Sequence, residues 1–438
     1  MTIPSNPPAS GLRRELGRWD LTAIGINQVI GAAVFAQPSL YAANVGAWSS
    51  WMVAAGGAAA MLIALCFAEV GSRFESTGGP YLYTRAAFGR FPAFEIGWML
   101  WFSRVASWAA VINVLATSLG FYVPALTSGS PRVALITAMI GVIAGINIRG
   151  IRQSSLVVNI LTVGKLLPLV VFIIAGIFFV DYSRLVPDQS PSFAQVSATG
   201  LLLIFAFGGY EVVPVVAGEA RDPRRGVPFA LIMTILVATV VMTLVQVVAL
   251  GTFVGLAASR TPLADASILF FGATGAALMT LGAVFSTTGN NMGAALSGSR
   301  NLFALAEQGD LPAVFGWVHP RFRTPATAIL VTSGVSLVLA LSGTFTTLAL
   351  ASSISRLIVY VATCASTLRL RTPQFAQRVS APTFVAPWGP IIPITAIVIA
   401  LTILAGATPQ QLMAGGLALA AGALLYLTAV WNRQPGQK

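Results

Sequence analysis

Long apolar stretches separated by short polar segments run through nearly the whole chain. Most are about 20 residues long or slightly longer, which is enough for a helix to cross a hydrocarbon core of about 30 Å. Strands of a membrane barrel would be about half that length and would alternate in polarity. The pattern therefore predicts twelve membrane-crossing helices, at residues 21–44, 47–71, 94–121, 132–149, 155–180, 197–217, 227–252, 266–298, 325–342, 345–368, 388–406 and 411–431.

Two of these stretches are interrupted in their middle. The first is broken within Gly25–Phe35, which contains Asn27, Gln28 and two glycines, and the sixth is broken within Phe205–Glu211, which contains Gly208-Gly209. A helix broken inside a bilayer exposes backbone N–H and C=O groups that lipid cannot satisfy, so a break is tolerated where it lines a cavity and binds something. The pairing predicts a solute transporter.

The spacing of the breaks predicts how the chain is organised. They lie five crossings apart. Because five is an odd number, the two broken helices cross the membrane in opposite directions, as they would in an inverted repeat of five helices plus five. The predicted order is a cytoplasmic tail, repeat one, repeat two, two appended helices and a second cytoplasmic tail, at residues 1–20, 21–180, 197–368, 388–431 and 432–438.

The composition agrees with a membrane protein. Only 9% of the 438 residues are charged and 56% are hydrophobic, whereas a soluble globule has a charged fraction of roughly 25%. The prediction is an all-α polytopic membrane protein embedded in a lipid bilayer.

The net charge of +12 does not indicate nucleic acid binding, because the basic residues sort by membrane side. Most of the 25 Lys and Arg residues lie in the tails and in the loops on the side of the N-terminus. By the positive-inside rule, both termini are predicted to be cytoplasmic, in the plasma membrane.

Several kinds of chemistry are disfavoured by the residues present. The only histidine, His319, lies in a predicted loop, which excludes a histidine-rich metal site or a His-based triad, and we expect no cofactor. Both cysteines, Cys66 and Cys364, lie in predicted helices and are expected to be small apolar packing residues rather than a disulfide. A membrane-embedded enzyme would need convergent acids and bases, and Glu211 is the one clear intramembrane acid.

Three motifs, in order along the chain, resemble those of a known family. The broken first helix resembles the signature Gly-Ile-Gly…Ile-Gly-Ser-Gly-Ile-Phe, with Gly25 and Gly31 kept and Asn27, Ala32 and Ala33 in place of Gly, Ser and Gly. The other motifs are Glu69-Val70-Gly71 with Gly78-Gly79-Pro80-Tyr81, and, in the second half, Phe205 to Glu211, Gly218-Glu219 and Ser299-Arg300-Asn301 with Gly309-Asp310. From about Gly17 to Arg371 the chain resembles the amino acid–polyamine–organocation (APC) superfamily of permeases. That resemblance implies a LeuT-like fold with helices 1 and 6 broken at the midplane, an amino acid bound there, and alternating access.

The resemblance also implies roles for residues at the breaks. The N–H groups of the outer half of the first helix would hold a substrate carboxylate, since a helix N-terminus favours an anion. The free carbonyls would accept from the substrate ammonium. The residues implied are Gly31, Ala32 and Ala33 for the carboxylate and Val29, Phe205 and Gly208 for the ammonium. The alternative is that the glycines of the first helix only allow close helix packing.

Three further residues each have two possible roles. Asn290 in the eighth helix could hydrogen-bond the substrate or join helices. Phe205, which matches the family's gating aromatic residue, and Tyr210 could form an aromatic gate over the solute, or could be ordinary core residues.

Two charged residues are candidates for proton coupling. Lys165 stands about ten residues into the fifth helix, too deep for a surface residue, and it matches a lysine that replaces the sodium ion in proton-coupled relatives. The alternative is a structural lysine that snorkels towards the cytoplasm. Glu211 follows the second break and would need a basic partner, for which Arg104 and Arg356 are candidates. A structural ion pair is the alternative to a proton-coupling role.

The sequence thus predicts a secondary active transporter of an amino acid or related amine, coupled to protons or working as an exchanger. It contains no Gly-x-x-x-x-Gly-Lys-Ser/Thr loop for ATP. The alternatives are a sodium-coupled amino acid or polyamine transporter, and an amino acid sensor without transport. The sequence indicates no oligomeric state.

Overall fold

The computed structural model describes residue 14 and residues 16–120, 122–187 and 189–431, except for the side chains of residues 151–159 and 429–431. Within these ranges the chain is helical, and its one extended pairing is an isolated parallel bridge between Leu16 and Ala220. The α-helices are α1 (Arg18–Val29), α2 (Ala33–Ala36), α3 (Pro38–Val45), α4 (Ser49–Gly71), α5 (Pro80–Phe88), α6 (Arg90–Gly120), α7 (Gly129–Arg149), α8 (Ile151–Gly176), α9 (Phe193–Phe207), α10 (Val212–Val215), α11 (Pro223–Thr252), α12 (Pro262–Glu307), α13 (Ala326–Ser342), α14 (Phe345–Arg371), α15 (Pro373–Ala376), α16 (Ile391–Ala405) and α17 (Pro409–Trp431).

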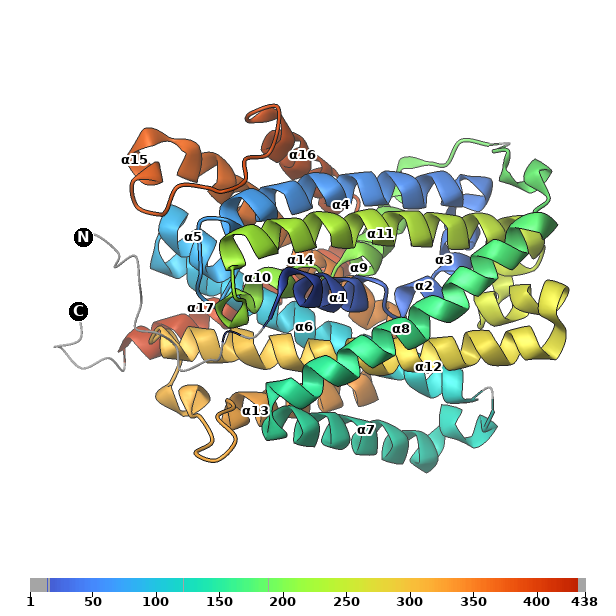
Figure 1. Cartoon of the computed structure of the whole chain (residues 1–438), viewed down its shortest axis with the longest axis horizontal. Coiled ribbons are helices and arrows are strands. Elements are labelled where there is room, and N and C mark those ends of the chain that lie inside the picture. Colours follow the sequence, from blue (N-terminus) through green and yellow to red (C-terminus); the bar gives the residue numbers. More distant parts are fainter. Residues whose placement is uncertain (1–13, 15, 121, 188, 432–438) are drawn as a thin grey trace.

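The long helices run lengthwise through a bundle, as Figure 1 shows. In the described residues, nine helical segments are long and apolar enough to cross a membrane, and α9, α13 and α16 are shorter apolar helices of 15 to 17 residues. Each segment predicted from the apolar pattern contains a helix in the described part of the chain. The protein is therefore a multi-pass membrane protein.

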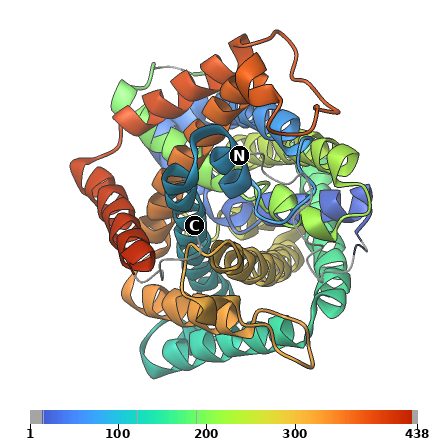
Figure 2. The same ribbon diagram turned by 90° about the vertical axis from the view of Figure 1, so that its left-hand side faces the viewer.

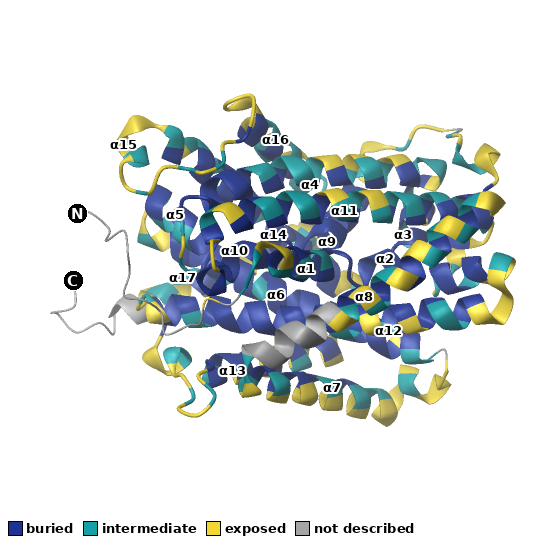
Figure 3. Cartoon of the chain, in the orientation of Figure 1, coloured by how far each residue is buried: buried dark blue, intermediate teal, exposed yellow. Residues whose placement is uncertain are grey.

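Burial separates central helices from peripheral ones. In the most apolar window of α6, 94% of the residues are buried inside the protein, against 11% in that of α17. Figure 3 shows the buried residues gathered on α1, α6, α10 and α14, and exposed residues on the outer faces of α7 and α8. The exposed positions of α8 include Ile160, Val163 and Leu167. Such an apolar outer face suits contact with lipid.

Both predicted breaks are present. The first helix stops at Val29 and resumes at Ala33, and the sixth predicted segment stops at Phe207 and resumes at Val212. A Cβ at Gly31 would lie 2.5 Å from Nδ2 of Asn290 on α12, so a larger residue there would require the Asn290 side chain to move. The end-on view in Figure 2 shows the long helices arranged around the middle of the bundle.

Contacts between loops divide the molecule into two ends. One end joins the segment before α1 to the loop after α10, the start of α6 to the end of α12, and the end of α4 to the end of α14, through Leu16–Glu219, Arg90–Asp310 and Glu69–Arg371. The other end joins the α3–α4 turn to the loop before α9, and the loop after α8 to the end of α11, through Trp48–Gln189 and Asp181–Gly251. The first end gathers loops that the charge pattern predicts to be cytoplasmic.

Candidate functional site

The two breaks lie against each other. Gly209 has a φ of +130°, and a Cβ there would lie 2.6 Å from the carbonyl oxygen of Gln28. The same Gln28 oxygen accepts a hydrogen bond of 2.8 Å from Nδ2 of Asn290, and Nε2 of Gln28 donates to the Asn290 carbonyl at 3.3 Å. The structure thus places Asn290 directly on the first break.

Most polar groups at the breaks already have partners within the chain. The Val29 carbonyl accepts from the Gly31 N–H at 2.8 Å. The Phe205 carbonyl accepts from the Gly208 N–H at 3.2 Å and from Nη1 of Arg356 at 3.2 Å. These two carbonyls, which the resemblance implied to be free for a substrate ammonium, are thus engaged in the present state. The buried Ala32 and Ala33 lie at the start of α2.

Lys165 is fully buried and bonds to the first break. Its Nζ donates to the backbone carbonyl and to Oδ1 of Asn27, both at 2.6 Å, and Nδ2 of Asn27 donates to the Gly289 carbonyl at 3.0 Å. One ammonium therefore joins α8 to the end of α1 and, through Asn27, to α12. The sequence showed Asn27 only as a departure from the family signature, and a polar side chain at that position was the available signal for this partner.

An ion cluster occupies the second break. The Glu211 carboxylate, through Oε1, lies 2.8 Å from Nη2 of Arg104 on α6 and 3.0 Å from Nε of Arg356 on α14. Its Oε2 accepts from the Gly209 N–H at 2.7 Å and from the Tyr360 hydroxyl at 3.3 Å. None of the three charged side chains is more than 2% exposed. Both candidate counter-ions are therefore used, and Tyr360, one helical turn after Arg356, is a partner that sequence reasoning missed.

The two predicted gating aromatic residues face different neighbours. The Phe205 ring packs edge-on against Phe345, with centroids 5.7 Å apart, and lies 5.5 Å from the Arg356 guanidinium carbon. Tyr210 instead stacks on Tyr360, with centroids 5.6 Å apart. They therefore do not form one aromatic cluster in this state.

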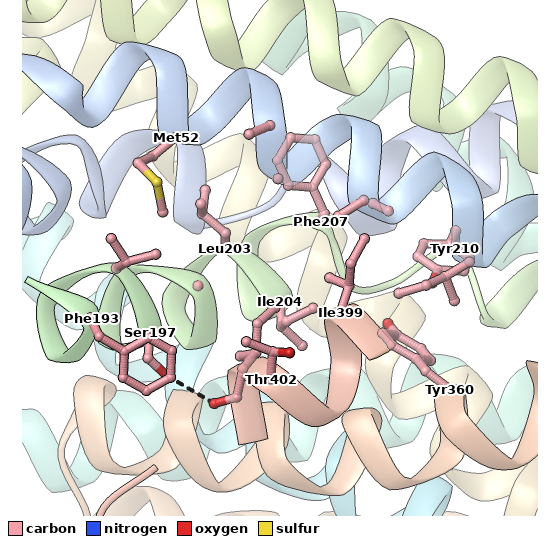
Figure 4. A pocket seen from close by; sticks show the side chains of 18 residues that line it. Met52, Phe193, Ser197, Leu203, Ile204, Phe207, Tyr210, Tyr360, Ile399 and Thr402 are labelled. Atoms are coloured by element: carbon pink, nitrogen blue, oxygen red, sulfur yellow. Dashed lines mark hydrogen bonds between the residues drawn. The ribbon is translucent and has the colours of Figure 1, made fainter. Parts of the chain in front are cut away.

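A cavity of about 300 Å³ lies between α4, α9 and α16. In Figure 4, Tyr210 and Tyr360 stand at one end of it, and Met52 and Phe193 stand towards the other. The hydroxyls of Ser197 and Thr402 donate to backbone carbonyls, at 2.9 Å each, so the walls present mainly apolar surface. Through Tyr360 the cavity adjoins the Glu211 cluster.

Polar groups also close the end of the molecule that carries the segment before α1. Glu219 and Arg300 are both buried there, and burial raises the pKa of the Glu219 carboxyl while the charge of Arg300 opposes the shift. Asp310 accepts from the Tyr81 hydroxyl at 2.7 Å and from Nε of Arg90 at 2.5 Å. Burial, together with the neighbouring Asp310, raises the pKa of Tyr81.

Two other charged residues at this end, Asp222 and Arg224, bond to backbone groups. Asp222 caps α11 by accepting from the Arg225 N–H, and Arg224 donates to the carbonyls of Ser72 and Ala381.

Glu211 is not the one buried acid among the helices, which corrects the sequence interpretation. Glu69, near the end of α4, is 1% exposed and pairs with Arg371. Glu95, near the start of α6, is also buried, and its carboxyl oxygens have no hydrogen-bond partner among the described residues. In the ranges that the structure describes, no three His, Cys, Asp or Glu side chains are grouped to hold a metal ion.

A bundle of apolar helices whose buried polar groups converge on two helix breaks defines a membrane permease. The chain belongs to the amino acid permease family, whose model matches residues 16–430.

Three relatives illustrate the family. An uncharacterized transporter of Mycobacterium tuberculosis is 31% identical over 82% of this chain and 81% of its own. The serine/threonine exchanger SteT of Bacillus subtilis is 27% identical over 94% of this chain and 95% of its own. The methylthioribose transporter of the same species is 27% identical over 74% of each chain. These relatives are transporters, so the protein is not an enzyme, as the sequence predicted.

Proposed function

We propose that the protein is a secondary active transporter that moves an amino acid, or a related amine, across the plasma membrane by alternating access. One observation carries this proposal: two helix breaks, far apart in the sequence, pack against each other inside an apolar bundle and bring buried polar groups together. The names of relatives such as SteT support an amino acid as the solute.

The proposed architecture is the predicted one, with twelve crossings and a LeuT-like five-plus-five inverted repeat. Among the described residues, nine long and three shorter apolar helical segments would supply the crossings. The matching interruptions after Val29 and Phe207 support the repeat. The gathering of basic loops at one end supports cytoplasmic termini.

The proposed solute position lies between the breaks. The N–H groups of Gly31, Ala32 and Ala33 would hold the carboxylate, with Asn290 beside them, and the Gly31 N–H would first have to leave its bond to the Val29 carbonyl. Phe205 and Tyr210 would close over the solute from separate sides, since each packs against a different aromatic neighbour. For the carbonyls of Val29 and Phe205 to meet an ammonium, each would use the remaining lone pair of its oxygen.

Lys165 is proposed to replace a coupling cation. Its Nζ lies 2.6 Å from two oxygens of Asn27, so Lys165 in its protonated form places a positive charge between the first break and α12. A sodium ion at this place would compete with that charge. Transport is therefore proposed to be independent of sodium and to be driven by protons or by exchange, with Glu211 as a second candidate for proton coupling.

Uptake into proteoliposomes tests the function and its coupling. The purified full-length protein is assayed with a panel of labelled amino acids and amines, under imposed proton or sodium gradients and with internal solute for exchange. We expect uptake that needs no sodium and that Lys165→Met abolishes, while Lys165→Arg, which keeps the cation, retains part of it. Uptake that requires sodium and survives Lys165→Met would refute the coupling proposal.

A further inference from the structure

The ion cluster at the second break carries an excess positive charge. Two guanidinium groups, of Arg104 and Arg356, share the single carboxylate of Glu211, and all three side chains are almost completely buried. A buried ion without a counter-charge costs several kcal/mol, so an unbalanced cluster is not explained by stability alone. Intramembrane charges of this kind mark functional sites.

No other described acid near the breaks balances the cluster. Glu69 is bound by Arg371, and Glu219 lies after α10, where the charge of Arg300 acts on it. Glu95 lies on the side of α6 that packs against α17. A Cβ built at Gly422 of α17 would be 2.9 Å from Oε2 of Glu95. Lys165, at the first break, adds a further cation rather than an acid.

The arginines also occupy backbone groups that an ammonium would need. Arg356 donates from Nη1 to the Phe205 carbonyl, and a Cβ at Gly208 would collide with the same guanidinium group. Arg104 donates from Nη2 to the Gly209 carbonyl at 3.4 Å. A positive charge at these carbonyls repels an ammonium and attracts a carboxylate, which a guanidinium binds through paired hydrogen bonds.

We infer that the transported solute is an acidic amino acid, whose side-chain carboxylate is bound by Arg104 and Arg356 at the second break. The α-carboxylate and the ammonium then remain at the first break, and the Phe205 carbonyl, which does not accept from the ammonium in this scheme, stays bonded to Arg356. This inference rests on the proposed function and narrows it, because a net charge of −1 on the solute balances the excess charge of the cluster. The two arginines are specificity-determining residues in this scheme.

Competition between isosteric solutes tests the inference. Aspartate and glutamate are compared with asparagine, glutamine and lysine as inhibitors of labelled glutamate and glutamine uptake into proteoliposomes. We expect the acids to be about tenfold or more better than their amides, because a charge-assisted hydrogen bond replaces a neutral one. Lysine should be the weakest competitor.

Two variants distinguish recognition from a structural role. Arg104→Gln and Arg356→Gln each leave Glu211 with one arginine, so the remaining pair is electrically balanced and the protein is expected to fold. Each should lower the preference for glutamate over glutamine by about tenfold, whereas a merely structural role would reduce uptake of both solutes equally. Arg104→Lys, which keeps the charge, should keep part of the preference.

The outcomes separate the two proposals. Uptake with equal inhibition by acids and amides, or an acid preference unchanged in both glutamine variants, overturns the inference and leaves the proposed function standing. If no amino acid is transported, the melting temperature of the detergent-solubilised protein is measured with glutamate and with glutamine. A rise with glutamate only, lost in Arg104→Gln, supports the anion site and overturns transport, and no rise with either solute overturns both.

Discussion

Glu211 is predicted to be the charge on which the assembly of the second break depends, so Glu211→Gln should be far more damaging than the loss of either arginine. The carboxylate lies 2.8 Å from Arg104 and 3.0 Å from Arg356. Opposite charges about 4 Å apart attract by roughly 4 kcal/mol at an effective dielectric constant of about 20. Glu211→Gln removes both attractions and leaves two guanidinium groups that repel each other.

The expected cost follows from this balance. The Glu211→Gln protein no longer has to bury a charged carboxylate, and this gain offsets part of the loss. Removing one partner of a buried ion pair typically costs about 3–5 kcal/mol. Arg104→Gln loses one attraction but also removes the repulsion between the arginines, so its cost should stay below about 2 kcal/mol. The double variant Arg104→Gln with Glu211→Gln should recover part of the loss caused by Glu211→Gln alone.

Thermal denaturation in detergent, followed by size-exclusion chromatography of the protein that remains soluble, ranks the variants. The expected order of melting temperature is wild type, Arg104→Gln, the double variant, and Glu211→Gln. A Glu211→Gln protein as stable as wild type, or an Arg104→Gln protein as unstable as Glu211→Gln, would show that the cluster is not held by this charge balance.

Three further predictions concern other contacts of the site. Gly209→Ala should cost about 1–3 kcal/mol in a melting experiment, because φ is +130° and the new Cβ meets Gln28, whereas Gly416→Ala, where no atom lies within 4 Å, should be harmless. Asn27→Ala should slow uptake as Lys165→Arg does, and the double variant should be no slower than the worse single variant; additive losses would argue against one shared unit. Because the pKa of the Glu219 carboxyl is raised by folding, the folded protein binds more protons than the unfolded chain above a pH of about 4.5, so stability falls as pH rises through the folded-state pKa. Glu219→Gln should remove that fall, and its melting temperature relative to wild type should be higher at neutral pH than at acidic pH.

The sequence predicted the helices and both interruptions, because apolar length and local glycine or amide residues are visible one segment at a time. The break at Gly208-Gly209 is an example, since two glycines in an otherwise apolar stretch already weaken a helix. Arg104, Lys165 and Arg356 could also be placed within helices, and Glu211 at the second break, by counting residues.

Their partners could not be predicted in the same way, because they depend on how distant segments pack. Arg104 and Arg356 lie on α6 and α14, which meet beside the second break, and no local spacing relates these positions. The burial of Glu95 likewise depends on a distant segment and could not be predicted. Glu95 lies near the start of α6, where a carboxylate is normally solvated, and it is buried because the distant α17 packs over it.

The bridge between Leu16 and the loop after α10 provides a natural reporter of conformational state. The Leu16 N–H donates to the Glu219 carbonyl at 3.0 Å, and the Arg221 N–H donates to the Leu16 carbonyl at 2.9 Å, so both amide protons are held in backbone hydrogen bonds while this end of the bundle is closed. Opening this end would release both at once. The deuterium exchange rates of the two amides should therefore change together, and a ligand that traps the closed state should slow both by the same factor.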